Sequence, residues 1–387
     1  MRQSNTMGTT ANRIVSIDAL RVIVILFMIM GHTSPFESPP LSIGKELDLA
    51  TILNQAIRFI IPFFFVLAGY FWGMKVRTSG DAWGSTRPLL ARFTFLFFAW
   101  SLIYLLPFNI VETFKFGELG PLKRIYWNIV YAFEHPLKSL AEGTMGHLWF
   151  LMAMVCVLLI AAALLSRRME RTLLALGVVL YVVGLSGGAY SLTPLGFESE
   201  LQTRDGPFFS LLFFAIGHKL QQFKPQRSWF WGGLLMTLVG GLMQYAELSF
   251  LHEGWGASWQ QEYVFSTALY GVGVALVALS DPPFLRLPRI AALGPLVVGI
   301  YCSHYIFVQA LWPLERLWGG NPLWDIGFVL VVFLLSLGLT ALMHQHPKTR
   351  RLVSSRAEPQ RRPAEKAVHT GGGELPAEGS SRPASVR

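Results

Sequence analysis

The stretch that most constrains the fold runs from Arg13 to His32 and reads RIVSIDALRVIVILFMIMGH. It has the length of a membrane-spanning helix, which needs about 20 mostly apolar residues, yet it carries Asp18, Arg21 and His32. A charge near the centre of a span costs about 2.5–3.5 kcal/mol on insertion scales. At about 3.6 residues per turn, the three side chains share one stripe of the helix, with His32 about 16 Å beyond Arg21. Such a stripe is predicted to face protein or water rather than lipid.

The rest of the chain indicates a polytopic helical membrane protein. Of its 387 residues, 52% are hydrophobic and 14% are charged, whereas soluble proteins are about a quarter charged. We therefore predict an all-α fold with about ten transmembrane helices. The predicted spans are residues 14–33, 54–74, 88–108, 147–166, 172–190, 206–222, 229–250, 262–280, 291–312 and 323–344.

The charges of the loops predict the orientation in the membrane. With the N-terminus in the cytoplasm, the inside loops 75–87, 167–171, 219–227 and 281–289 are short and net basic. The outside loops carry mostly acidic residues, except the long loop before the fourth span, which mixes both signs and does not indicate an orientation. We expect both termini on the cytoplasmic side of the inner or plasma membrane. The net charge of +9 is assigned to these loops and the tail, so no nucleic-acid partner is predicted. The aromatic segment 125–133, in the long loop before the fourth span, is expected to lie along the interface or to dip into the protein.

Three segments are predicted: a cytoplasmic N-terminal segment (1–13), a transmembrane domain (14–345) and a tail (346–387). The tail is rich in Pro, Gly, Ser, Arg and Glu and is expected to be disordered and cytoplasmic, because it has too little apolar surface to fold. Cys156 and Cys302 lie in apolar blocks without a CxxC pattern. We interpret both as packing residues and predict no metal site.

Five segments, in chain order, resemble motifs of the acyltransferase-3 family. The first is DALRVIVILFMIMGH, in which a basic residue (Arg21) and a histidine (His32) are separated by ten residues, with Asp18 where the family often has an acidic residue. The others are IPFFFVLAGYFWG at 61–73, GHLWFLMAM at 146–154, FFAIGHKL at 213–220 and VGIYCSHYIF at 298–307. The resemblance covers about residues 14–345. It implies a membrane O-acyltransferase, usually an O-acetyltransferase, with acetyl-CoA as donor and a carbohydrate or glycoconjugate as acceptor.

The resemblance makes His32, Arg21 and Asp18 the candidate catalytic residues. A neutral imidazole at His32 could accept a proton from the acceptor hydroxyl as that hydroxyl attacks a thioester, or His32 could carry the acyl group transiently. Arg21 could bind a phosphate of coenzyme A or the thioester region, or pair with Asp18 at i,i+3. Asp18 is interpreted as the group that orients Arg21.

Arg92 and Arg87 are further candidates for binding coenzyme A. They stand near the predicted cytoplasmic start of the third span, where a basic mouth would attract the phosphates of the donor. The general excess of basic residues in cytoplasmic loops would also explain the presence of these two arginines.

Trp149, His147, His304 and Arg58 are the candidate contacts for the acceptor. Each also has a plain structural interpretation. Trp149 and His147 could be interfacial anchors, His304 a hydrogen-bonded core residue within its span, and Arg58 a snorkelling side chain. We interpret His218, which ends the sixth span, as an interfacial residue.

Two other classes of function fit a chain of this kind. One is a transporter or flippase of lipid-linked sugars, although we find no repeat with interrupted helices. The other is a scaffold without catalysis, which leaves the polar stripe of the first span unexplained. Within acyl transfer, a succinyl or longer acyl group, or an antibiotic or lipid acceptor, stays open at this point, as does the oligomeric state.

Overall fold

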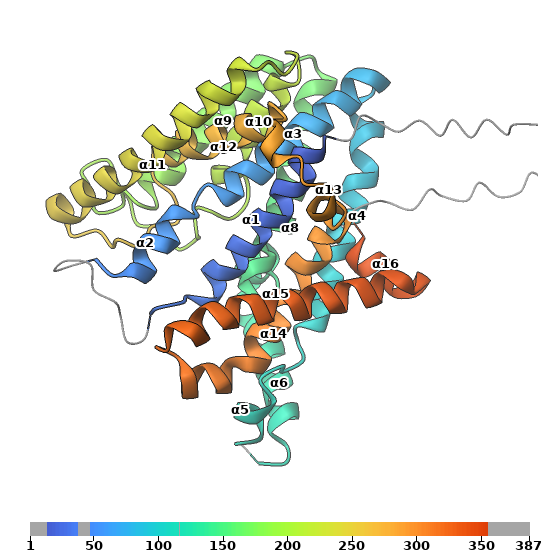
Figure 1. Ribbon diagram of the computed structural model, residues 1–387, viewed down its shortest axis with the longest axis vertical. Coiled ribbons are helices and arrows are strands. Elements are labelled where there is room, and N and C mark those ends of the chain that lie inside the picture. Colours follow the sequence, from blue (N-terminus) through green and yellow to red (C-terminus); the bar gives the residue numbers. More distant parts are fainter. Residues whose placement is uncertain (1–13, 38–46, 116, 355–387) are drawn as a thin grey trace, which may run out of the picture. The chain divides into compact units, whose positions relative to one another are not determined.

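The computed structural model describes residues 14–37, 47–115 and 117–354, and helices dominate this part of the chain. The longer helices are α1 (Val15–Thr33), α3 (Ile60–Ser79), α4 (Ala82–Ile103), α8 (Trp149–Ser166), α9 (Glu170–Ser186), α10 (Pro207–Leu220), α11 (Ser228–Trp255), α12 (Thr267–Leu279), α14 (Val297–Trp318) and α15 (Pro322–Gln345) (Figure 1). The shorter helices are α2 (Leu49–Ala56), α5 (Ile110–Phe114), α6 (Gly120–Glu134), α7 (Pro136–Glu142), α13 (Pro288–Ala291) and α16 (Pro347–Val353).

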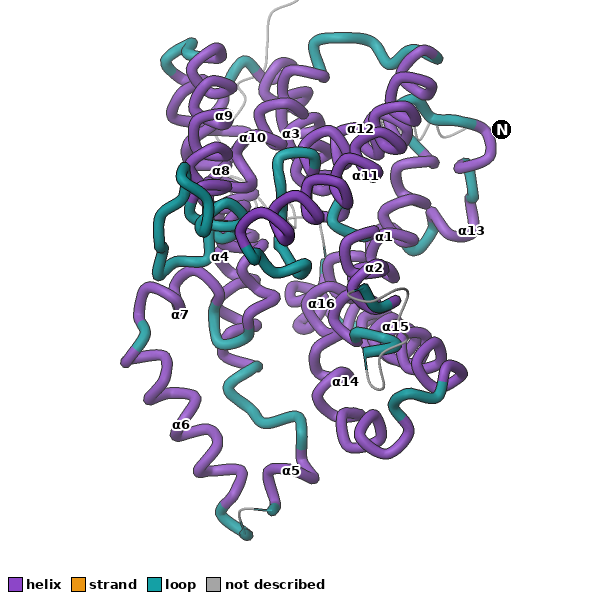
Figure 2. The backbone as a smooth tube through the Cα atoms, turned by 90° about the vertical axis from the view of Figure 1, so that its left-hand side faces the viewer, coloured by secondary structure: helices purple, strands orange, loops and turns teal. Residues whose placement is uncertain are grey.

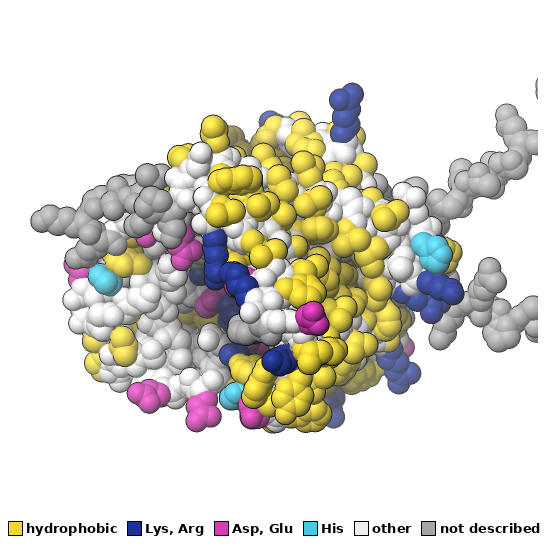
Figure 3. All heavy atoms as spheres, turned by 90° about the horizontal axis from the view of Figure 1, so that it is seen from below, with side chains coloured by type: hydrophobic (Ala, Val, Ile, Leu, Met, Phe, Trp, Pro, Cys, Tyr) yellow, Lys and Arg dark blue, Asp and Glu magenta, His cyan; other side chains and the backbone are white. Residues whose placement is uncertain are grey.

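Each of the ten predicted spans overlaps one of the longer helices. Within the described residues, six segments are long and apolar enough to cross a membrane, and α10 and α12 are shorter apolar helices. Hydrophobic side chains also cover much of the face seen in Figure 3, as expected for a surface that meets lipid. The all-α polytopic fold is therefore confirmed. The number of ten spans stays a prediction, because length and composition establish six.

Two predicted spans are interrupted. The second consists of α2 and α3, with a turn between them that carries Arg58. The ninth consists of α13, a 3₁₀ turn at Gly294–Leu296 and α14. The aromatic segment 125–133 forms most of α6, which projects from the other helices (Figure 2). Trp127 is 61% exposed, so this segment does not dip into the protein.

The C-terminal region differs from the expected tail. Pro347–Val353 forms α16, which contacts α4, α14 and α15. The indole Nε1 of Trp100 on α4 donates a hydrogen bond of 2.9 Å to the carbonyl oxygen of Leu352. The rest of the predicted tail, 355–387, and the predicted N-terminal segment, 1–13, lie outside the described residues.

Two glycines allow α3 and α10 to pack backbone against backbone. A Cβ atom at Gly69 would lie 2.0 Å from the carbonyl oxygen of Phe214, and one at Gly217 would lie 2.0 Å from that of Val66. Small residues let membrane helices approach this closely. Helix α9 packs on α10 as well, so α3, α10 and α9 lie side by side (Figure 1).

Helix α1 is the element that positions the candidate site. It contacts α3, α12, α13, α14 and α15, and Figure 1 shows it crossing the middle of the helices. Ile25 and Met28, which lie on the same stripe as Arg21 and His32, are buried. The polar stripe of α1 is therefore held among other helices, as predicted from the sequence.

Candidate active site at the C-terminal end of α1

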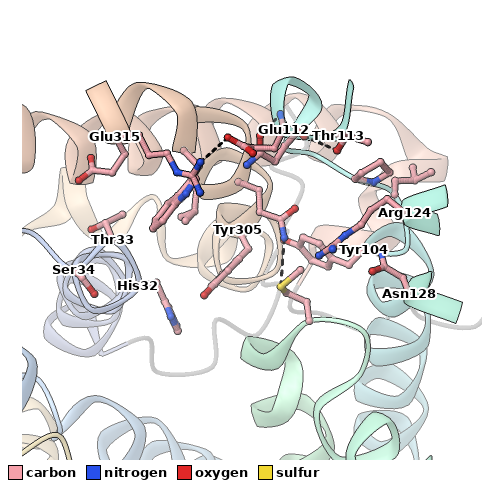
Figure 4. A pocket seen from close by; sticks show the side chains of 18 of the residues that line it. His32, Thr33, Ser34, Tyr104, Glu112, Thr113, Arg124, Asn128, Tyr305 and Glu315 are labelled. Carbon is pink, nitrogen blue, oxygen red and sulfur yellow. Dashed lines mark hydrogen bonds and ion pairs between the residues drawn. The ribbon is translucent and has the colours of Figure 1, made fainter. Parts of the chain in front are cut away.

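A pocket of about 1010 Å³ opens at the C-terminal end of α1. Pockets for small molecules commonly have volumes of about 300–1,000 Å³. His32, Thr33 and Ser34 form the wall that comes from α1 (Figure 4). The opposite walls come from the end of α4, from α5 and α6, and from α14, through Tyr104, Asn109, Glu112, Arg124, Asn128, Tyr305, Gln309, Trp312, Glu315 and Arg316. In Figure 3, charged side chains stand around a hollow.

The end of α1 fixes the place of His32. The helix stops at Ser34, whose φ of 44° is left-handed and whose N–H donates to the carbonyl oxygen of Met30. The hydroxyl of Thr33 donates a 3.1 Å hydrogen bond to the carbonyl oxygen of Ile29. These contacts hold the last turn, so the imidazole of His32 stands at the wall of the pocket.

Three histidines that are distant in the sequence meet here. The ring centre of His32 lies 5.2 Å from that of His304 and 6.5 Å from that of His147. The rings of His147 and His304 are 4.9 Å apart. His147 is 4% exposed and His304 is fully buried. The sequence singled out each histidine separately, and the fold brings them together from α1, α14 and the turn before α8.

The hydrogen bonds of the buried histidines show which of their ring nitrogens have no partner. The Nδ1 of His304 lies 2.6 Å from the carbonyl oxygen of Tyr301. A carbonyl only accepts, so Nδ1 carries the proton, and Nε2 presents a lone pair in the neutral ring. Among the described residues, neither this Nε2 nor either ring nitrogen of His147 has a hydrogen-bond partner. Buried polar atoms are normally paired, so these nitrogens indicate a place for a ligand or water.

The histidine cluster does not form a metal site. Over the described residues, no group of three or more His, Cys, Asp or Glu side chains could hold a metal ion. The arrangement suits proton transfer and hydrogen bonding instead.

Two tyrosines complete the cluster. Tyr305 stacks on His147 with ring centres 4.8 Å apart, and it lies 5.2 Å from His32. Figure 4 shows the side chains of His32 and Tyr305 pointing toward one another. The ring of Tyr104 lies 5.1 Å from His147, and its hydroxyl donates a 2.7 Å hydrogen bond to the carbonyl oxygen of Cys302. No motif in the sequence marks Tyr104, whereas Tyr305 directly follows His304, which the sequence had singled out.

Arg21 and Asp18 lie apart from the pocket. The Nη1 of Arg21 is 3.7 Å from the Oδ1 of Asp18, so the expected i,i+3 pair forms. A Cβ atom at Gly294 would lie 3.2 Å from the Asp18 side chain, which places the pair against the turn before α14. Arg21 precedes His32 by three helical turns, or about 16 Å, and is not among the residues that line the pocket.

The two arginines of α4 differ in their surroundings. The guanidinium of Arg92 donates hydrogen bonds to the backbone carbonyls of Arg351 and Ser354, so it ties α16 to α4. Arg87 is exposed in the first turns of α4. Neither arginine lines the pocket beside His32.

Arg58 and Trp149 belong to an ionic cluster beside the histidines. The Nη1 of Arg58 lies 2.8 Å from the Oε2 of Glu262, and Arg204 donates to the other oxygen of that carboxylate. Arg204 also stands over the indole of Trp149, 5.8 Å from the ring centre. The sequence had not singled out Arg204.

A pair of carboxyl groups adjoins this cluster. The Oδ1 of Asp205 lies 3.5 Å from the Nε of Arg204, and the Asp205 side chain is 9% exposed. Burial raises the pKa of Asp205 to about 7. The positive charge of Arg204 opposes this shift, and the neighbouring Glu142 adds to it.

Two curated proteins are similar to part of this chain. The chain is 27% identical over 213 residues to an amino-acid racemase of Enterococcus faecalis, a match that covers 52% of this chain and 27% of the relative. It is 27% identical over 250 residues to a serine/alanine racemase of Enterococcus gallinarum, covering 60% of this chain and 33% of the relative. These matches take in about a third or less of the relatives' length. No solved structure matches.

One family comparison covers most of the molecule. The acyltransferase-3 family, described as an acyltransferase domain, matches residues 14–342. The match takes in α1 with its polar stripe, the turn that carries His147 and the helix that carries His304. The chain therefore belongs to the acyltransferase-3 family.

Proposed function

We propose that this protein is a membrane O-acyltransferase that moves an acetyl group from acetyl-CoA to a hydroxyl of a sugar or glycan. The observation that carries the proposal is the meeting of His32 with two buried histidines at the wall of a large pocket. Membership of the acyltransferase-3 family supports the same class of reaction.

In the proposed reaction, His32 is the proton acceptor. The acceptor hydroxyl attacks the carbonyl carbon of the thioester, and its proton passes to the neutral imidazole. The bond between carbon and sulfur then breaks. The departing thiolate of coenzyme A takes up the proton from the imidazolium of His32. His304 and Tyr305 adjoin His32 and would help to orient its ring. In the alternative, His32 itself takes the acetyl group and passes it to the acceptor.

The donor is proposed to enter from the cytoplasmic side, with both termini on that side. Arg21 would then contact a phosphate or the pantetheine arm along α1, about 16 Å from His32. Asp18 would orient Arg21 through their ion pair. Arg87 is exposed and could attract the donor electrostatically. Arg92 is a weaker candidate, because its guanidinium already binds the carbonyls around the end of α16.

The lining of the pocket supports an acceptor with several hydroxyl groups. Asn109, Asn128 and Gln309 present amides, and Glu112 presents a carboxylate. Trp312 is 39% exposed at the same wall. Amides and carboxylates hydrogen-bond to hydroxyls, and an exposed aromatic face can pack on a sugar ring. His147 and His304 contact His32 and Tyr305, which line the pocket. Trp149 and Arg58 would act on the acceptor indirectly, because they contact Arg204 and Glu262.

The relatives suggest a second candidate substrate. Their names concern amino acids, including serine and alanine. The pocket also holds both charges that a free amino acid needs, in Glu112, Glu315, Arg124 and Arg316. Serine would offer a hydroxyl as acceptor, and an amino acid would equally suit a transporter. Dependence on coenzyme A separates acyl transfer from transport.

The test uses purified protein in nanodiscs and follows thermal stability during titration with acetyl-CoA and coenzyme A. A ligand at 100 times its Kd stabilises the folded state by about 2.7 kcal/mol. We expect this stabilisation in the wild type, its loss in Arg21→Ala, and its retention in Arg227→Gln, which removes an exposed cation outside the site. The absence of any shift in well-folded wild-type protein would contradict acetyl-CoA as the donor.

A further inference from the structure

A second pocket lies where α8 and α10 end and α9 begins, at the end of α8 that is opposite to the histidine cluster. Its volume is about 600 Å³, and it is formed by the turn between α8 and α9 and by the last turns of α10. The lining residues are Arg168, Met169, Glu170, Arg171, Thr172, Leu173, Leu174, Ala215, His218 and Lys219. The loop charges predict this end to be cytoplasmic.

The pocket is positively charged. Its lining contains three cationic side chains, Arg168, Arg171 and Lys219, and one carboxylate, Glu170. That carboxylate accepts a 3.1 Å hydrogen bond from the Nε2 of Gln222. The pocket also contains the first turn of α9, a helix of 17 residues, where backbone N–H groups and the helix dipole favour an anion. Cations and helix end together indicate an anion rather than a neutral ligand.

His218 provides an independent sign of a ligand. It lines the pocket and is 5% exposed, yet neither ring nitrogen has a hydrogen-bond partner among the described residues. The Nδ1 edge lies against α3, where a Cβ atom at Gly73 would come within 2.7 Å. An imidazole always carries at least one N–H donor, and a buried donor without a partner costs about 1–3 kcal/mol. An anion in the pocket would accept this hydrogen bond.

The position of this pocket separates it from the histidine cluster. His147 lies two residues before α8 and Arg168 two residues after it, and the 18 residues of α8 span about 27 Å. Basic pockets between membrane helices on the cytoplasmic side commonly bind phosphate-bearing head groups.

We propose that this pocket binds a phosphate group, with His218 donating a hydrogen bond and Arg168, Arg171 and Lys219 supplying the opposite charge. Two sources carry that chemistry: the head group of an anionic phospholipid, and the nucleotide end of coenzyme A. The inference does not depend on the proposed acyl transfer, since a phosphate site at this end of the bundle would serve a transporter equally well.

The experiment uses the full chain in nanodiscs and two kinds of probe. One arm compares discs of phosphatidylcholine alone with discs that also contain phosphatidylglycerol, and counts retained lipids by native mass spectrometry. The other arm titrates adenosine 3′,5′-bisphosphate and coenzyme A into phosphatidylcholine discs and follows thermal stability. The variants are Arg171→Gln with Lys219→Gln, and separately His218→Phe, which keeps an aromatic ring without nitrogens. The matched control is Lys224→Gln with Arg227→Gln, an equal change of charge at exposed positions outside the pocket.

We expect the double variant of Arg171 and Lys219 to weaken phosphate binding at least about ten-fold, in line with hydrogen bonds to charged groups, while the control leaves it unchanged. Retention of phosphatidylglycerol that depends on the pocket assigns a lipid, and a shift with the bisphosphate assigns the nucleotide. Should His218→Phe fail to fold, the double variant decides alone. Binding of neither probe, or binding that the pocket variants and the control affect equally, overturns the proposal.

Discussion

Replacement of Gly217 by alanine tests the close packing of α3 and α10. The new Cβ atom would lie 2.0 Å from the carbonyl oxygen of Val66 and 2.9 Å from the amide nitrogen of Tyr70. Ordinary contact begins at 3.4 Å, so the first distance is about 1.4 Å too short. Both neighbours are backbone atoms that cannot rotate aside, and the two helices must therefore separate.

The expected cost follows from this geometry. Overpacking of a well-packed contact costs about 1–3 kcal/mol, whereas alanine in a helix gains up to about 1 kcal/mol over glycine. The clash is expected to win, and Gly217→Ala should be destabilised. The matched control is Gly338→Ala on α15, where nothing lies within 4 Å of the new atom and a small gain in stability is expected. Reversible unfolding in mixed micelles, with increasing SDS, measures both variants. Equal stability of the two would refute the packing of α3 on α10 described above.

Three further predictions concern the site and its surroundings. His304→Asn keeps a side-chain donor near the carbonyl of Tyr301 but removes the Nε2 lone pair. Acyl transfer should therefore fall at least about ten-fold, with little change in the free energy of unfolding. Full activity would show that His304 is not part of the site. Arg92→Gln should speed hydrogen exchange in α16 without weakening the binding of acetyl-CoA, and a loss of affinity instead would restore Arg92 as a donor contact. Because burial raises the pKa of Asp205 from 3.8 to about 7, the folded protein binds more protons in that interval. Its stability should fall as the pH rises through 7, and denaturation at pH 5 and pH 8 should show a smaller fall in Asp205→Asn, an identical fall being contrary to the prediction.

The sequence predicted the polar stripe of α1 because helical periodicity is a local property. Arg21 and His32 need only the count of residues per turn to be placed on one face, and the ion pair of Arg21 with Asp18 follows from their spacing. The helices themselves were equally predictable, because long apolar segments leave few alternatives in a membrane. Their ends were less so, as the turn at Arg58 illustrates.

Contacts between distant segments were not predictable. Arg204 lies in a polar loop of the sequence, and only the fold places it over Trp149. Tyr104 ends its helix without a motif, and its proximity to His147 depends on how α4 packs on the turn before α8. The residues of α16 are mostly polar and basic, so composition suggested a tail, whereas hydrogen bonds from Trp100 and Arg92 hold it in place.

The most direct test of the account measures acetyl transfer by His32→Ala. Labelled acetyl-CoA is supplied to membranes that contain wild-type or variant protein at equal, verified levels, together with the cell's glycans and lipid-linked sugars as acceptors. General acid–base catalysis contributes about 10²–10⁴-fold, so His32→Ala should lose at least about 99% of the labelled product. A control variant, Arg227→Gln, removes an exposed cation outside the site and should keep most of the activity. Normal transfer by correctly inserted His32→Ala would contradict the central role given to the histidine cluster.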